Sequence, residues 1–133
     1  MTNTVQVKKI SDTEYIVGEN RLSLIEGNII YVISQGEQTE EIALIYKGIC
    51  EDIISGLEGK VSYLIDINKC GKNAPEAREV WKMMSASEKT HKVATFGLNP
   101  VARVIASFVI GTYKNRNLLF FKTKEEAIQW LLK

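Results

Sequence analysis

The stretch VSYLIDI at residues 61–67 decides the fold, because it is almost continuously apolar up to Asp66. Such a run is typical of a central strand that is buried on both faces. Two shorter apolar runs follow, VATF at 93–96 and LLFF at 118–121, and a helix pattern comes after each of the three. Strands that alternate with helices build parallel sheets. We therefore expect an α/β fold with a mostly parallel sheet covered by helices.

Each of these helix patterns has its own start signal. Residues 73–76 combine an N-cap asparagine, a proline in the first turn and a glutamate three residues after the cap. Asn99 is also followed by a proline and opens a helix expected over residues 99–114, while Thr123 begins a capping box. Two tryptophans are expected in the core of these helices, Trp81 and Trp130.

The first half of the chain predicts a strand meander followed by a helix. Three runs, at residues 14–18, 22–26 and 29–34, alternate with turn residues that tolerate positive φ. A polar stretch then leads into apolar positions that recur every three to four residues from Ile42 to Leu57, and Gly59 is expected to end this helix. With the second half, this gives about four helices in a single domain over residues 1–133.

Composition bounds the class of protein. The chain has 133 residues, of which 45% are hydrophobic and 25% charged, as in ordinary globular domains. Cys50 and Cys70 lack the spacing of a metal site, no apolar run is long enough to span a bilayer, and residues 1–10 show no signal-peptide pattern. We expect a soluble, cytoplasmic protein with reduced thiols, no membrane span, no metal and no cofactor.

Four segments of the chain are informative together: LIDI at 64–67, ATFGL at 94–98, ARVIA at 102–106 and FKTKEEAIQWL at 121–131. They resemble the small bacterial SpoIIAA-like proteins of the STAS domain superfamily, and the resemblance covers residues 14–132. It implies an α/β fold and a regulatory, non-enzymatic domain that binds a protein partner or a small ligand. In the anti-sigma-factor antagonists of this superfamily, a serine after the central strand is phosphorylated to switch partner binding. Because this chain has no serine, threonine or tyrosine between Asp66 and Glu76, we expect no such switch.

The candidate binding site lies where the parallel strands end, since ligands and partners of such sheets usually meet the loops at that edge. We predict that a regulatory protein partner contacts the loops at residues 66–73 and 97–99. The candidate residues are Asp66, Asn68, Lys69, Cys70, Lys72, Asn73, Gly97 and Asn99.

A small-ligand or lipid carrier is the alternative interpretation. Lys69, Lys72, Lys122 and Lys124 are expected at the same edge, beside helix N-termini that favour anions. Such a carrier would bind an anionic or apolar metabolite there, with the helix at 99–114 as part of a lid. A carrier should contain an internal apolar cavity or retain a co-purified ligand, whereas a partner module should expose a flat apolar patch and contain no cavity.

Catalysis has little support in the sequence. Cys70 is expected in a loop between two lysines and before a helix, surroundings that lower the pKa of a thiol. However, His91 is expected at the C-terminal end of a helix, at the opposite edge of the sheet, so the two cannot form a dyad. Asp66 has no second acid near it by spacing and is expected to tie down its own loop, so we predict a protein that is not an enzyme.

The aromatic residues and the charge distribution bear on two further classes of partner, nucleic acid and a second copy of the chain. Nucleic-acid binding is not expected, because the aromatic residues other than Tyr31 and Tyr113 fall on faces predicted to be buried. Residues 1–67 contain 11 acidic and 5 basic residues, whereas residues 68–133 contain 5 and 12. This asymmetry, with an exposed edge strand in the meander, motivates the hypothesis of a homodimer.

Overall fold

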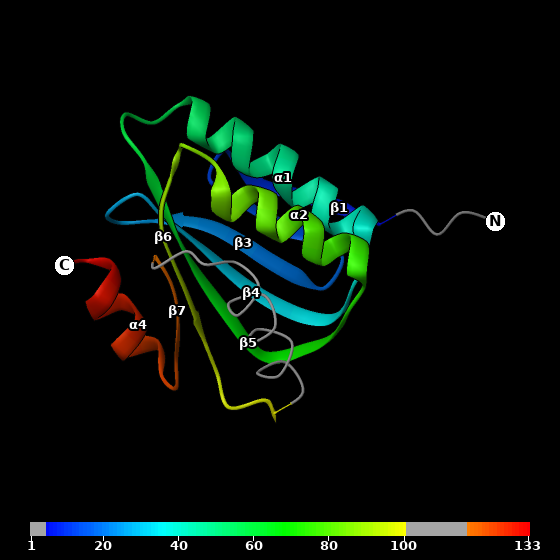
Figure 1. Cartoon of the computed structure of the whole chain (residues 1–133). Helices are drawn as coiled ribbons and strands as arrows, with labels where there is room; N and C mark the ends of the chain where they lie inside the picture. Colours follow the sequence, from blue (N-terminus) through cyan, green and yellow to red (C-terminus); the bar gives the residue numbers. More distant parts are fainter. Residues whose placement is uncertain (1–4, 101–116) are drawn as a thin grey trace.

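A computed structural model describes residues 5–100 and 117–133. Its elements, in chain order, are β1 Val7–Ser11, β2 Glu14–Val17, β3 Asn20–Ile25, β4 Ile29–Gln38, α1 Glu40–Ser55, β5 Val61–Asn73, α2 Pro75–Ala86, β6 Thr90–Phe96, β7 Leu118–Phe121 and α4 Lys124–Leu131 (Figure 1). The helix predicted over 99–114 falls almost entirely outside the described residues. The part of the chain that is described contains three helices, against the four or so expected.

One seven-stranded sheet runs through the domain, and its strands lie side by side in sequence order. β1 to β4 form an antiparallel meander, while β4, β5, β6 and β7 are parallel neighbours. The expected meander joined to a parallel sheet is therefore confirmed. In such a sheet, β4, β5, β6 and β7 have their carboxyl ends at one edge.

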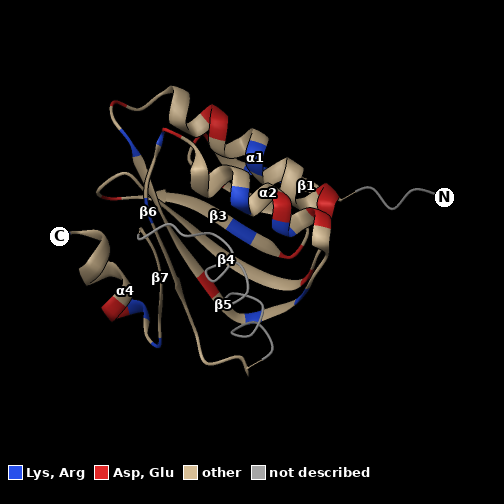
Figure 2. Ribbon diagram, in the orientation of Figure 1, with Lys and Arg blue, Asp and Glu red and all other residues tan. Residues whose placement is uncertain are grey.

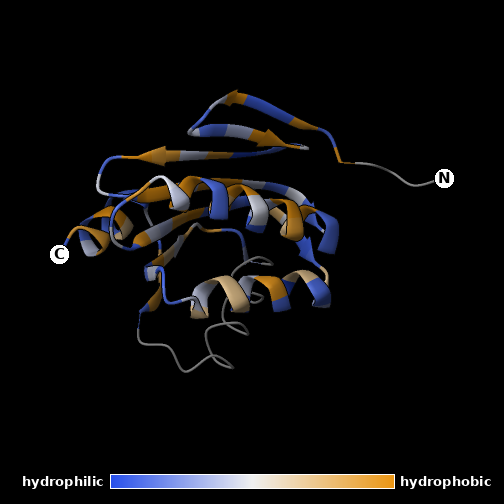
Figure 3. Cartoon of the chain, turned by 90° about the horizontal axis from the view of Figure 1, so that it is seen from above, coloured by the Kyte–Doolittle hydropathy of each residue, from blue (hydrophilic) through white to orange (hydrophobic). Residues whose placement is uncertain are grey.

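Alternating residues of the strands build two apolar layers. Ile30, Val32 and Tyr63 belong to the layer packed against α1 and α2, whereas Ile29 and Leu64 belong to the layer packed against α4. The helices are accordingly amphipathic, and Figure 3 shows hydrophobic and hydrophilic residues mixed along α1 and α2. Because the central strands are covered on both faces, they have the apolar character that the sequence shows.

The meander is longer than predicted at both ends. β1, whose five residues are all exposed, was not expected, because an exposed edge strand leaves no apolar pattern. β4 was expected to end at Ser34 but continues to Gln38, whose buried amide donates to Oδ1 of Asn20 at 2.9 Å. A hydrogen-bonding partner inside the protein allows this polar residue to remain in the strand.

The first helix is shifted from its predicted bounds. It begins at Glu40, since the Thr39 hydroxyl accepts a hydrogen bond from the backbone N–H of Ile42 and caps the helix. It ends at Ser55 with Gly56 as the C-cap, so the prediction that Gly59 ends it is wrong. Gly59 has φ +80° and belongs to the turn before β5.

The most important correction concerns β5. Residues 68–72 were expected to form a loop, but β5 continues to Asn73 because the extended end of β4 pairs with it, with irregularities in the register. Gly36 lies opposite Cys70, and a Cβ on Gly71 would lie 3.1 Å from the Gly36 carbonyl group. The two glycines allow the strands to approach this closely.

Two predicted helix starts can be compared with the structure. Thr123 caps α4 as expected, since its hydroxyl accepts from the Glu126 N–H at 3.2 Å. Asn73 does not cap α2; the N-cap is Ala74, which makes no side-chain cap bond, and Pro75 occupies the first turn as expected. Asn73 is instead the last residue of β5, and its Oδ1 accepts a hydrogen bond from the indole N–H of Trp81.

Other details of the second half also differ from expectation. β6 begins at Thr90, three residues earlier than predicted, so His91 is an exposed strand residue and not the last residue of a helix. Trp81 and Trp130 are half-buried and pack against the two separate apolar layers. Within the described residues, no helix is both long enough and apolar enough to cross a membrane.

Candidate functional site

A set of hydrogen bonds, here called the clamp, joins the second half of β5 to the segment that follows β6. Oδ1 of Asp66 accepts hydrogen bonds from both the backbone N–H and the side-chain amide of Asn68, each at 2.9 Å. Oδ1 of Asn68 in turn accepts from the backbone N–H of Leu98 at 3.0 Å. Asp66 therefore ties down its own chain segment, as expected, and orients Asn68 toward the segment that follows β6.

Asn99 and Gly97 complete this clamp. The Asn99 side-chain amide donates to the backbone carbonyl of Cys70 at 2.8 Å and of Asn68 at 3.3 Å. Gly97 has φ +147°, and a Cβ there would lie 3.1 Å from both the backbone N and Oδ1 of Asn68. Only glycine fits this approach without strain. The clamp thus joins four of the predicted site residues: Asp66, Asn68, Gly97 and Asn99.

The clamp presents one large apolar side chain to solvent. Leu98 is 64% exposed, although its backbone is bonded to Asn68. Lys69 and Lys72 are also exposed on the end of β5. We call residues 66–73 and 97–99 together the strand-end edge. Leu98 falls inside the predicted contact segment 97–99 but was not named among the candidate residues, although an apolar residue between Gly97 and Asn99 was a readable signal.

The side chains of Cys70 and Asn73 line the protein interior, whereas those of Lys69 and Lys72 are exposed. Cys70 is only 6% exposed, and the Asn73 amide donates to its Sγ at 3.5 Å. Burial raises the pKa of the Cys70 thiol, and the bond from Asn73 offsets this in part. The expected lowering of the pKa is therefore wrong, because β5 places the thiol in the protein interior and not in a loop between lysines.

Charges at the strand-end edge are mixed in sign. Lys122 and Lys124 follow the end of β7 as predicted, whereas Lys69 and Lys72 lie within the last residues of β5. Nζ of Lys124 lies 4.6 Å from the centre of the Tyr31 ring. Acidic residues share the edge, since the first turns of α1 and α2 also begin there; they are Glu40, Glu41 and Glu76. In Figure 2, red segments mark acidic residues near the N-terminal ends of these helices. The arrangement is therefore not the uniformly basic surface that favours an anion.

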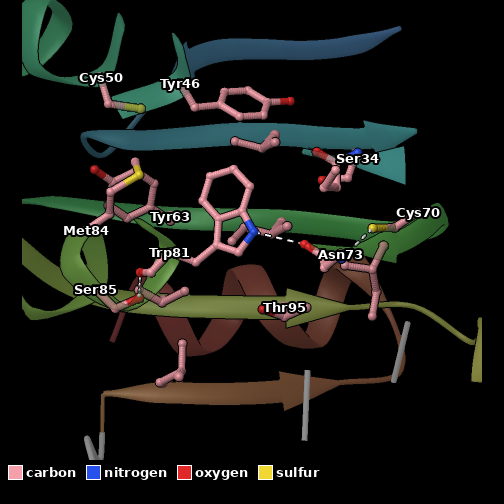
Figure 4. A pocket seen from close by; sticks show the side chains of 16 residues that line it. Ser34, Tyr46, Cys50, Tyr63, Cys70, Asn73, Trp81, Met84, Ser85 and Thr95 are labelled. Atoms are coloured by element: carbon pink, nitrogen blue, oxygen red, sulfur yellow. Dashed lines mark hydrogen bonds between the residues drawn. The ribbon is translucent and has the colours of Figure 1, made fainter. Parts of the chain in front are cut away.

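A cavity of about 130 Å³ lies between the sheet and the helices α1 and α2. Figure 4 shows Trp81 at its centre, with Tyr46 and Tyr63 nearby and Asn73 and Cys70 toward one end. None of its described lining residues is charged; they are Val32, Ser34, Gln38, Tyr46, Cys50, Tyr63, Ile65, Ile67, Cys70, Asn73, Trp81, Met84, Ser85, Val93, Thr95 and Leu118. The carrier alternative predicted an internal apolar cavity, and this one has the expected character. The sequence did not locate it, because its lining residues come from two helices and four strands.

β1, the edge strand of the meander, has features that bear on the homodimer hypothesis. β1 carries Lys8, Lys9 and a register shift before Ser11, features that discourage pairing with another strand. The homodimer thus stays a hypothesis. Within the described residues, no three histidine, cysteine or acidic side chains gather closely enough to hold a metal ion.

Comparison with known proteins identifies the class first. The chain matches the crystal structure of an uncharacterized protein of the DUF3478 family from Shewanella loihica PV-4, described as having a SpoIIAA-like fold, with a TM-score of 0.63. The match covers 98% of both chains at 15% sequence identity and so shows the fold alone. This protein has a SpoIIAA-like fold, as the sequence resemblance indicated.

The family is given by a second comparison. The chain belongs to the family described as a domain of unknown function, DUF7793, whose model matches residues 23–133. The matched segment includes the cavity and the whole strand-end edge. Comparison with curated proteins finds no match.

Proposed function

We propose that this protein is a non-enzymatic regulatory module that binds a protein partner through the strand-end edge. The observation that carries the proposal is the exposure of Leu98 on a segment whose backbone is fixed by hydrogen bonds. Exposed leucines are common on protein surfaces. Because the backbone of Leu98 is already fixed by hydrogen bonds to β5, a partner can bury this side chain without first ordering the segment.

The clamp supports binding because it reduces the entropy lost on association. Asp66 and Asn99 hold the strand-end edge in one conformation through side-chain bonds to Asn68 and to the β5 backbone. Full burial of an exposed leucine is worth about 1.5–3 kcal/mol, and a partner that covers Leu98, which is 64% exposed, gains the larger part of this. Little of this gain is lost to ordering the segment, since it is already ordered.

The mixed charges favour a protein surface over a small anion as the partner of this edge. Lys69 and Lys72 are exposed near the acidic first turns of α1 and α2. A protein can match alternating charges over an extended interface, and such matching confers specificity. A free anion at the same place would be repelled by the neighbouring carboxylates.

Regulation by phosphorylation of the strand-end edge is not part of the proposal. No hydroxyl-bearing residue occurs between Asp66 and Glu76, and Asn73 is held by Trp81 and Cys70. We also keep the prediction of a cytoplasmic location, which agrees with two free thiols at Cys50 and Cys70.

Affinity capture from the source cell extract at physiological salt tests the proposal. The wild type is compared with Leu98→Glu and with the control Leu44→Glu, which changes a leucine on α1 that is 52% exposed. We expect one stoichiometric protein to be retained by the wild type and the control and lost with Leu98→Glu. If the two variants recover the same proteins, the strand-end edge is not the binding surface.

A further inference from the structure

The cavity of about 130 Å³ beneath α1 and α2 is large for the interior of a small domain. Native interiors are packed as densely as organic crystals, and voids larger than a water molecule are few. Side chains that line an empty void lose the dispersion contacts that neighbouring atoms would supply. A molecule of matching size and polarity would restore these contacts, so the cavity is a candidate binding site.

The floor of the cavity is a row of side chains from neighbouring parallel strands. Val32 of β4 is paired with Ile65 of β5, and Ile65 is paired with Thr95 of β6. All three side chains line the cavity, as do Trp81 and Met84 on α2, which packs against this face of the sheet. The sheet and α2 therefore enclose the space between two largely apolar surfaces.

Several polar groups of the lining are already bonded within the protein. Oδ1 of Asn73 accepts from the indole of Trp81, and the Ser85 hydroxyl donates to the Trp81 carbonyl, each at 2.9 Å. Oε1 of Gln38 and the hydroxyl of Tyr46 have no partner, but neither atom is exposed to a molecule the size of water. A molecule in the cavity therefore meets few polar atoms with which it can bond.

Two further hydroxyls, those of Ser34 and Thr95, line the cavity but cannot share one water molecule. They belong to β4 and β6, with β5 between them. Strands that are two positions apart in a sheet are separated by about 10 Å. A buried water typically makes about three hydrogen bonds, and apolar cavities of this size stay dry and bind apolar molecules. Water is therefore a poor occupant of this cavity.

The size and course of the lining indicate which molecule fits. An engineered protein cavity of about 150 Å³ binds benzene, so a volume of about 130 Å³ holds about six carbon atoms. The lining follows β5 from Tyr63 to Cys70, and Figure 4 shows Trp81 between Met84 at one end and Asn73 at the other. This elongated course suits a chain better than a ring. The described lining residues carry no charge, which disfavours ions.

We propose that this cavity is a binding site for an uncharged, linear aliphatic chain of about six carbon atoms. The chain packs between Ile65 on the floor and Trp81 on α2, and dispersion contacts and burial from water hold it. No hydrogen bond to the cavity wall is required. This site is separate from the partner contact at Leu98, and its test does not depend on that contact.

The indole NMR signals of the two tryptophans report binding and its place. Trp81 lines the cavity, whereas Trp130 packs on Phe121 in the other apolar layer. We expect 1-hexanol, titrated into the full chain, to shift the indole N–H signal of Trp81 to saturation and to leave that of Trp130 in place. Hexanoate, which has the same length but a charge, should shift neither. A Trp81 signal that does not saturate with hexanol, or equal shifts of both signals, overturns the proposal.

A series of straight-chain alcohols tests the size of the site. Butanol, pentanol and hexanol share one hydroxyl, so differences in their affinity report the chain alone. Each additional buried CH₂ should increase the affinity about fourfold. The cavity is full at about six carbon atoms, so octanol should bind no more tightly than hexanol. An affinity that does not rise from butanol to hexanol, or that rises equally steeply on to octanol, contradicts the assignment.

A variant that fills the cavity from α2 tests its place independently. Ser85→Leu adds carbon atoms at a lining position, and leucine is a good helix former. We expect the affinity for hexanol to fall about tenfold, because the added side chain takes the space of the ligand. The matched control is Ser55→Leu, since Ser55 is exposed on α1 and its hydroxyl also donates to a carbonyl of its own helix. Urea unfolding shows that both variants are folded, and equal hexanol affinities of the two overturn the proposal.

Discussion

The indole Nε1 of Trp81 donates a hydrogen bond to Oδ1 of Asn73 at 2.9 Å, and this bond fastens α2 to the end of β5. The amide of the same asparagine donates to Sγ of Cys70. Asn73 is thus a wall residue of the cavity that also ends the strand from which the strand-end edge is built. Its side chain is fully engaged within the protein and is not available as a helix cap.

Replacing Asn73 with alanine should destabilise the protein by about 1–3 kcal/mol, because it leaves the half-buried Trp81 N–H without its acceptor. Urea unfolding measures the change. Lys72→Ala, at the exposed neighbouring residue, is the control and should stay within about 0.5 kcal/mol of the wild type. Equal stabilities of the two variants would show that the bond contributes nothing.

A stabilising substitution follows from the missing cap of α2. Ala74 occupies the N-cap with extended backbone but offers no side-chain acceptor. Ala74→Ser should raise the free energy of unfolding by about 0.5–2 kcal/mol, the usual value of an N-cap hydroxyl. Thr123→Ala, which removes the cap of α4, should lower it by a similar amount. A neutral or destabilising Ala74→Ser would mean that the hydroxyl cannot reach the first-turn N–H groups.

Two glycines should respond to alanine in opposite directions. Gly97→Ala adds a Cβ 3.1 Å from Asn68 at φ +147°, so we expect a loss of about 1–3 kcal/mol of stability. Gly48 lies within α1, where a Cβ meets nothing within 4 Å. Gly48→Ala should therefore stabilise the protein by about 0.5–1 kcal/mol. Denaturant midpoints distinguish the two, and a harmless Gly97→Ala would show that the clamp tolerates a shift.

Stability should fall in alkaline solution. Burial raises the pKa of the Cys50 thiol to about 12, and it also raises the pKa of Cys70, Tyr46 and Tyr63. Above pH 9 the unfolded chain loses these protons while the native protein keeps them, so the unfolded state binds fewer protons. For Cys50, the contribution is complete below about pH 9 and is lost as the pH rises toward 12.

Urea unfolding between pH 7 and about 10.5 measures this dependence. We expect a steady decrease in the free energy of unfolding above pH 9, and a smaller decrease in Cys50→Ala, whatever the absolute stability of that variant. A free energy that stays constant across this range, or a decrease equally steep in Cys50→Ala, would contradict the account of the buried thiol.

The parallel half of the fold could be predicted because its signals are local. The apolar runs at 61–67 and 118–121, the proline after Ala74 and the capping box at Thr123 all mark elements that the structure contains. Burial on both faces of the sheet forces an apolar composition, and caps require particular residue types. These constraints can be read without knowledge of any long-range contact.

Elements stabilised by distant partners could not be predicted. The polar residues 35–38 and 68–72 look like loops, yet they pair with each other as the ends of β4 and β5. Asn20 makes this pairing stable by bonding Gln38, across 18 residues of sequence. No local pattern records such a bond, and polar composition alone then favours the wrong assignment.

The candidate site could be predicted only in part, because some of its features depend on distant contacts. The clamp residues Asp66, Asn68, Gly97 and Asn99 were found because parallel strands bring their carboxyl ends together. The orientation of Cys70 toward the interior depends on the irregular end of β5, which the sequence does not reveal. The cavity beneath α1 and α2 also depends on how two helices and four strands pack together, which no local pattern records.

Photo-cross-linking at the strand-end edge tests the proposed function most directly. The photoreactive amino acid p-benzoylphenylalanine is placed at position 98, and in a control protein at position 44, and each is irradiated in the source cell extract. The account predicts one discrete cross-linked protein from position 98 that is absent from position 44 and disappears with an excess of unmodified protein. Cross-linking at position 98 that does not exceed that at position 44 would contradict it.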